Sequence, residues 1–83
     1  MAYKIYTKMN TADTCRDADN YVYTKIGYKE KIEDALKMAN DYIKKEFFRK
    51  DMKLSEGKGS IVYTATDFCS YPETIIIKQI KID

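Results

Sequence analysis

The stretch from residue 28 to residue 50 is the only long helical pattern in the chain, and it limits what the rest of the chain can form. Apolar side chains recur there every three or four residues, which is the spacing of an amphipathic helix with one buried face. These side chains are Tyr28, Ile32, Leu36, Ala39, Ile43 and Phe47. A single helix of this kind covers one face of a small sheet, so the remaining segments have to supply that sheet.

The segments on both sides of this helix alternate in polarity, as strands do. Residues 2–9 and 21–26 are predicted strands of one hairpin, and residues 60–66 and 74–82 are predicted strands of another. The order hairpin, helix, hairpin predicts an α+β fold of the ββαββ type. It is a two-layer sandwich, with a four-stranded antiparallel sheet and one long helix packed on one face. Residues 1–83 are expected to form a single domain, with a hairpin over 2–26, a helix over 28–50, a loop over 51–59 and a hairpin over 60–82.

The composition describes a small protein with nearly balanced charge. The 83 residues include 15 basic and 13 acidic side chains, for a net charge of +2, which by itself indicates neither nucleic acid nor membrane as a partner. No apolar run reaches the roughly 18–20 residues that span a bilayer, and the N-terminal residues lack the apolar core of a signal peptide. A cytoplasmic protein without membrane association is therefore expected, with its two cysteines as thiols.

The chain lacks the usual residues of catalytic and metal sites. It contains no histidine, which excludes Ser-His-Asp and Cys-His catalysis and removes the commonest transition-metal ligand. Cys15 and Cys69 lie in predicted connections, and a disulfide between them would need Cα atoms within about 7 Å. Asp17 and Asp19 match the first two ligands of an EF-hand loop, but Val22 stands where that loop requires glycine. We predict no enzyme activity, no catalytic residue, no metal site and no cofactor.

The predicted strands carry apolar side chains on both sides, whereas the outer face of a two-layer sheet is normally polar. In the last strand, Ile75 and Ile77 point one way while Ile76 and Ile80 point the other. The uncovered face needs a homodimer through the sheet, a foreign protein partner, or a β-bulge that changes the register. Tyrosine is enriched at interfaces, although it is also a good strand former. The predicted partner-binding residues are Tyr3, Tyr6, Tyr21, Tyr23, Ile75 and Ile77.

A basic cluster at the end of the predicted helix supports a second interpretation. Lysines beside Phe47 and Phe48 could neutralise phosphates while the rings stack on bases, which predicts nucleic-acid binding. The same cations are also expected at a helix C-terminus, where they interact favourably with the helix dipole. The cluster consists of Lys44, Lys45, Arg49, Lys50 and Lys53.

Residues 32–39, Ile-Glu-Asp-Ala-Leu-Lys-Met-Ala, follow two predicted strands and resemble the helix of HicB-type antitoxins. We carry no function over from that resemblance. The lysine- and isoleucine-rich composition resembles that of small proteins from phages or mobile elements. The function expected from the sequence is a non-enzymatic protein-interaction module, such as a phage or mobile-element inhibitor of a host defence protein. Nucleic-acid binding through the basic helix end is the alternative.

Overall fold

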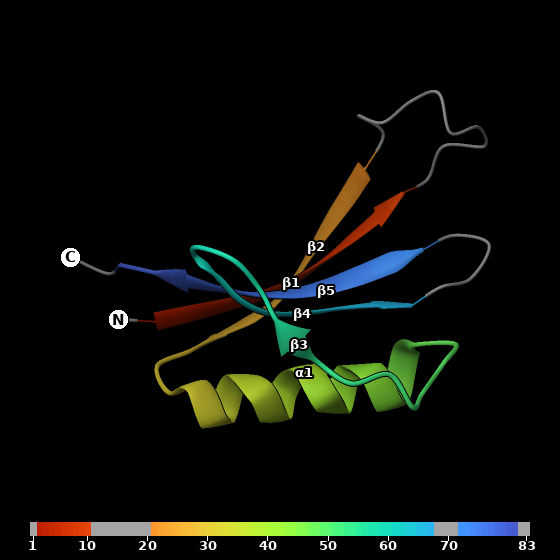
Figure 1. The fold of residues 1–83 in the computed structure, drawn as a ribbon, viewed down its shortest axis with the longest axis horizontal. Helices are drawn as coiled ribbons and strands as arrows, with labels where there is room; N and C mark the ends of the chain where they lie inside the picture. Colours follow the sequence, from red (N-terminus) through yellow and green to blue (C-terminus); the bar gives the residue numbers. More distant parts are fainter. Residues whose placement is uncertain (1, 11–20, 68–71, 82–83) are drawn as a thin grey trace.

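The computed structural model describes residues 2–10, 21–67 and 72–81 (Figure 1). One helix packs against one face of an antiparallel sheet, which confirms the α+β class and the single covered face. The sheet has five strands in the order β2-β1-β5-β4-β3, not the predicted four. The elements are β1 (Ala2–Asn10), β2 (Tyr21–Lys29), α1 (Ile32–Glu46), β3 (Ser55–Glu56), β4 (Ile61–Asp67) and β5 (Glu73–Ile80).

The strands β1 and β5, which are far apart in the sequence, lie side by side within the sheet. Strands β1 and β2 pair antiparallel, and so do β4 and β5. Strand β1 also pairs antiparallel with β5, with Ala2 opposite Ile80 and Ile5 opposite Ile77. The short strand β3 pairs with β4 and forms one edge. It falls in the segment 51–59 that the sequence assigned to a loop, because two residues are too few to show an alternating pattern.

The helix is shorter than the predicted range of residues 28–50. Tyr28 lies in β2, opposite Lys4, although its spacing from Ile32 fits the helical stripe. No side chain caps the start of α1 at Lys31. The other end comes at Phe47, which has extended backbone angles (φ −70°, ψ 142°).

Asp67 of β4 holds the chain as it leaves the helix. Its carboxylate accepts hydrogen bonds from the backbone N–H groups of Phe48 (2.7 Å) and Arg49 (3.2 Å), and its side chain is buried. Lys50 then folds back, and its Nζ donates to the carbonyl oxygens of Lys44 (3.0 Å) and Lys45 (3.4 Å). The Lys50 contacts satisfy carbonyl groups that a helix C-terminus leaves without partners, and the Asp67 carboxylate binds the N–H groups of the two residues that follow Phe47. Together these contacts hold the chain where α1 ends.

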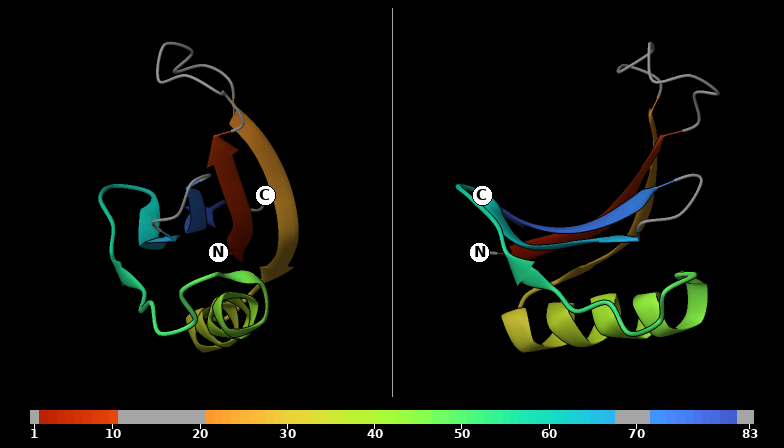
Figure 2. Two further views of the ribbon diagram at one scale, coloured as in Figure 1. Left: turned by 90° about the vertical axis from the view of Figure 1, so that its right-hand side faces the viewer. Right: turned by 45° about the vertical axis from the view of Figure 1, so that its right-hand side comes forward.

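The hydrophobic core lies between α1 and the sheet (Figure 2). Ile5, Ile75 and Ile77 come from the two central strands and are 0% exposed. Fully burying one such side chain contributes about 1.5–3 kcal/mol. The helix supplies small residues on its facing side, which let it approach the sheet closely. The buried cluster consists of Ile5, Ala35, Ala39, Ile43, Phe47, Ala65, Ile75 and Ile77.

A β-bulge in β2 decides which side chains share a face. Ile5 pairs with Gly27 while Tyr6 pairs with Lys25, so Ile26 is an extra residue in β2. Ile26 packs against the core cluster. Because strand residues alternate between faces, the extra residue brings Tyr28 to the same side as Lys25. The structure therefore contains the bulge that the sequence left open as one way to arrange the surplus apolar residues.

Candidate functional site

The side of the sheet turned away from α1, here called the far face, has a distinct composition. In Figure 2 the ends of the strands bend away from the helix, so the backbone of the sheet is concave on this side. The register places residues of all five strands on it. They are Lys4, Tyr6 and Lys8 of β1, Tyr23, Lys25 and Tyr28 of β2, Thr74, Ile76 and Lys78 of β5, Ile61, Thr64 and Thr66 of β4, and Ser55 of β3, together with Ala2 and Ile80.

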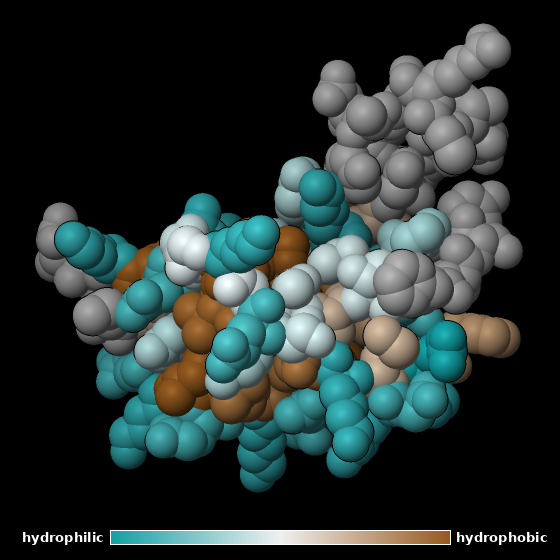
Figure 3. Space-filling view, in the orientation of Figure 1, coloured by the Kyte–Doolittle hydropathy of each residue, from teal (hydrophilic) through white to brown (hydrophobic). Residues whose placement is uncertain are grey.

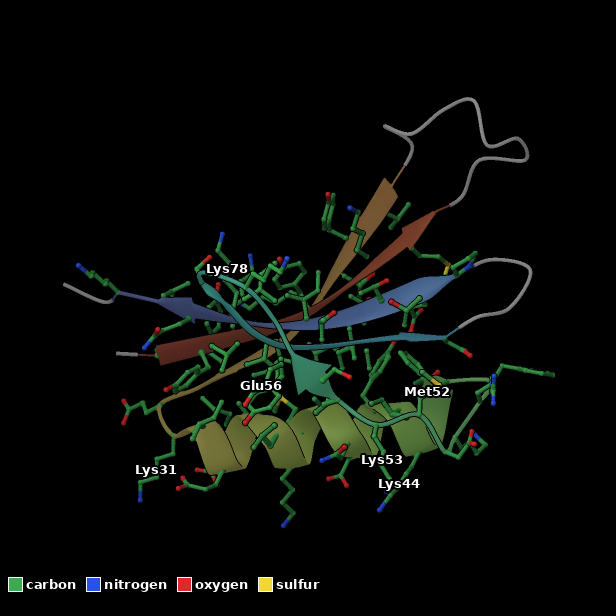
Figure 4. The ribbon with its side chains drawn as sticks, viewed as in Figure 1. Lys31, Lys44, Met52, Lys53, Glu56 and Lys78 are labelled. Carbon is green, nitrogen blue, oxygen red and sulfur yellow. The ribbon has the colours of Figure 1, made fainter. Side chains whose placement is uncertain are left out.

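The far face is positively charged. Four lysines lie on it, and none of its described residues is acidic. The acidic residues of β4 and β5, Asp67 and Glu73, are opposite each other in the register and lie on the helix side. Figure 4 shows Lys78 on the opposite side of the sheet from α1. Lysines grouped without carboxylates create a positive potential that attracts an anionic ligand.

A shallow hollow of about 320 Å³ opens on this face and is lined by Lys4, Tyr6, Tyr23 and Lys25. The ring centroids of Tyr6 and Tyr23 are 6.3 Å apart, with an interplanar angle of 45°. Lys4 Nζ lies 5.3 Å from the centroid of the Tyr6 ring. Two cationic groups therefore flank two adjacent aromatic rings. Burial, and then the neighbouring Tyr23, raise the pKa of Tyr6 above its ordinary value of 10.0.

The bulge in β2 extends this arrangement to a third ring. Lys25 Nζ lies 4.1 Å from the centroid of the Tyr28 ring, within cation–π distance. Tyr23 is 62% exposed and Tyr28 is 46% exposed, so both keep ring surface available to a ligand. By contrast, Ile76 lies between Tyr6 and Thr64 in the register and is only 7% exposed. The accessible surface is therefore aromatic and cationic.

The structure separates the residues that the sequence grouped as a partner-binding surface. Tyr6 and Tyr23 meet on the far face. Tyr3 lies on the helix side and packs against the core cluster. Ile75 and Ile77 also face the helix and are 0% exposed, so the prediction that they contact a partner is wrong. Alternation in β5 gives them the covered face. The side chain of Tyr21 is outside the described residues.

The basic cluster at the helix end is a different surface. Lys50 is bonded to the last carbonyl groups of α1, and Arg49 forms an ion pair with Asp51 (3.9 Å). In Figure 4, Lys44 and Lys53 lie on the helix side of the molecule, away from Lys78. Two of the five predicted nucleic-acid contacts therefore have local partners, and the cluster is not continuous with the far face.

The sequence analysis missed five of the far-face residues, Lys4, Lys8, Lys25, Tyr28 and Lys78. Part of the signal was present, because Lys4, Tyr6 and Lys8 alternate with apolar residues along β1. The grouping of Lys25, Tyr28 and Lys78 with these residues depends on how β2 and β5 pair with β1. Figure 3 shows the side of the molecule that carries β3 and β4. There apolar atoms gather between the sheet and the helix, unlike the lysines and tyrosines of the far face.

The described residues contain no group of three or more side chains that could hold a metal ion. Cys15, Cys69, Asp17 and Asp19 lie outside them. The one helix in this part of the chain is neither long nor apolar enough to cross a membrane.

The chain was compared with protein-family models, curated proteins and solved structures, and none of them matched. Its function has to be inferred from the geometry of the far face.

Proposed function

We propose that this protein is a non-enzymatic binding module that uses its far face to bind an anionic macromolecule. The observation that carries the proposal is the set of four lysines and three tyrosines on that face, with no carboxylate among the described residues there. The ammonium groups supply attraction. The tyrosine rings supply broad contact area with a hydroxyl that tolerates water.

The chemistry of the hollow supports binding in preference to catalysis. Its lining consists of lysine and tyrosine side chains from two adjacent strands. A covalent mechanism through a hydroxyl or thiol normally needs a base within hydrogen-bond reach of the nucleophile, and that base is in turn oriented by a third group. The interactions found here are two cation–π contacts and one ring pair, which hold the side chains in place as a surface.

The proposal keeps the non-enzymatic role expected from the sequence but changes the surface. The proposed contacts are now the lysines of the far face and no longer Ile75 and Ile77, so the partner is recognised by charge. A small domain that covers an anionic surface would also suit the inhibitory role inferred from composition. The helix-end cluster remains the competing surface, and an experiment has to compare the two directly.

The test is salt elution from a sulfated polyanion resin with two matched double variants. Lys4→Gln/Lys25→Gln removes two charges from the far face, and Lys44→Gln/Lys45→Gln removes two from the helix. We expect the wild type to bind at about 50 mM salt, where phosphate-like contacts are strong. The far-face variant should elute at clearly lower salt, and the helix variant should elute close to the wild type.

Two results would overturn the proposal. One is a wild-type protein that passes through the resin at low salt. The other is an elution shift that is as large for the helix variant as for the far-face variant. Circular dichroism and thermal unfolding of both variants would establish that each one is folded.

A further inference from the structure

We infer that the ligand of the far face is a single-stranded nucleic acid, with bases stacked on tyrosine rings and phosphates held by the neighbouring lysines. This inference rests on the proposed function, because it names the class of anion that the same surface binds. It moves nucleic-acid recognition away from the basic helix end and places it around the hollow formed by Lys4, Tyr6, Tyr23 and Lys25.

The kind of cation on the far face favours phosphate over a protein surface. All the basic residues described on this face are lysines. Protein–protein interfaces are enriched in arginine and depleted in lysine. Lysine binds phosphate as a compact point charge, whereas arginine provides a bidentate geometry that matches both carboxylates and phosphates. A lysine-only set is therefore unlike a typical protein–protein interface, and the choice of a nucleic acid rests on the exposed rings beside these lysines.

The exposed rings supply the other half of the recognition. Tyr23 and Tyr28 present their rings to solvent, and Lys25 lies between them on the same face of β2. Along β1, Tyr6 lies between Lys4 and Lys8. Successive residues on one face of a strand are about 6.7 Å apart, twice the rise per residue. Ring and ammonium groups thus alternate along two neighbouring strands, so a stacked base would have lysines beside its flanking phosphates.

The arrangement distinguishes single strands from duplexes. A base has to leave its helical stack before it can lie on a tyrosine ring, and a single strand provides such bases at little cost. A duplex keeps its bases paired, so it would touch the lysines and leave the rings unused. The sheet backbone, which is concave on the side of the far face in Figure 2, also suits a flexible strand that follows the surface.

The test is fluorescence anisotropy with three probes, compared at the same salt concentration. They are a labelled single-stranded oligonucleotide of about 12 nucleotides, the duplex of the same sequence, and poly-glutamate of similar charge. Binding to the single strand should be at least about tenfold tighter than binding to either competitor. RNA and DNA versions of the oligonucleotide show whether the sugar matters.

Variants of the tyrosine rings test base stacking separately from charge, because they leave every lysine in place. Tyr23→Ala should weaken single-strand binding about fivefold or more, because each stacked base contributes substantially. Tyr23→Phe keeps the ring and should bind within about twofold of the wild type. Phe48→Ala is the matched control, since Phe48 is 82% exposed but lies at the helix end, so its removal should leave binding unchanged.

The failures of the two proposals are distinguishable. Equal binding to single strand and duplex, or Tyr23→Ala binding like the wild type, would overturn the inference while far-face retention on the polyanion resin still stands. Tighter binding to poly-glutamate would identify an acidic protein as the partner class. Loss of binding to every polyanion, including the resin, would overturn the proposed function itself.

Discussion

The hydroxyl of Tyr42 illustrates how single polar groups are accommodated inside this small core. Tyr42 lies on α1 and forms side-chain hydrogen bonds with Glu73 of β5 and Thr7 of β1. Burial, and then the hydrogen bond to Glu73 and its charge, raise the pKa of Tyr42 from 10.0 to about 12. Three elements are thereby joined through one protonated phenol, and the edge of the Tyr42 ring also packs against Phe47.

Replacing this hydroxyl should lower stability in a pH-dependent way. We expect Tyr42→Phe to reduce the free energy of unfolding by about 1–2 kcal/mol at pH 8, because Glu73 loses a hydrogen-bond donor. The pKa is raised in the folded state, so the stabilisation is complete below pH 10 and disappears as the pH rises through about 12. Urea unfolding at pH 8 and pH 11 should therefore show a smaller difference between variant and wild type at pH 11.

Tyr23→Phe is the control for that measurement, because Tyr23 is mostly exposed on the far face. Its stability should match the wild type at both pH values. A Tyr42→Phe variant that is as stable as the wild type at pH 8 would show that the hydrogen bond to Glu73 contributes nothing.

At the scale of elements, the local sequence pattern predicted the helix, whereas long-range strand pairing determines which side chains share a face of the sheet. The apolar spacing of Ile32, Leu36, Ala39 and Ile43 is a local property, and it predicted that a helix packs on the sheet. The true start at Ile32 could not be predicted, since no residue there provides a capping side chain and Tyr28 continues the stripe. The bulge at Ile26 becomes visible only in the pairing with β1, and its one local signal is Gly27, since an isolated glycine in a strand often marks a bulge but does not say which side chains the bulge brings together. The lysines and tyrosines could therefore not be gathered onto one face from the sequence.

The connection from β3 to β4 contains two glycines whose surroundings differ, and the difference can be tested by substitution. A Cβ on Gly57 would lie 2.4 Å from the carbonyl oxygen of Ile61, while the Gly57 N–H is already bonded to Val62 O (2.9 Å). The backbone at this point cannot move without breaking that bond. Gly57→Ala should cost about 1–3 kcal/mol in the free energy of unfolding, through overpacking. Urea unfolding is the measurement.

Gly59 is the comparison residue, since nothing lies near a Cβ built there but its φ is +62°. Gly59→Asn should be nearly neutral, because asparagine tolerates this left-handed conformation. If Gly57→Ala proves as mild as Gly59→Asn, the close approach of residues 57 and 61 does not constrain the fold.

At the scale of the whole molecule, the distribution of charge matters more than its total. A net charge of +2 by itself gives no indication of an anionic partner. The fold places four lysines on one side of the sheet and two carboxylates of β4 and β5 on the other. The net charge counted from the sequence does not show this separation, because the separation depends on how side chains alternate along strands that are distant in the chain.

This charge distribution predicts that two copies do not associate through their far faces. Such a dimer would bring lysine against lysine, and like charges across an interface are unfavourable. Light scattering at low salt should therefore give the mass of one chain, 9.7 kDa. A dimer of the wild type that becomes tighter in Lys4→Gln/Lys25→Gln would place the interface on the far face, contradict the prediction and restore the homodimer expected from the sequence.

The central pairing of β1 with β5 also has a consequence for synthesis on the ribosome. Strand β1 is made before β5, yet β5 lies between β1 and β4 in the finished sheet. The nascent chain can form α1 and the first hairpin early, but no strand connects that hairpin to β4 until residues 73–80 emerge. Completion of the sheet is therefore expected to wait for these residues, and a stop codon before Glu73 would leave a product that cannot build the sheet.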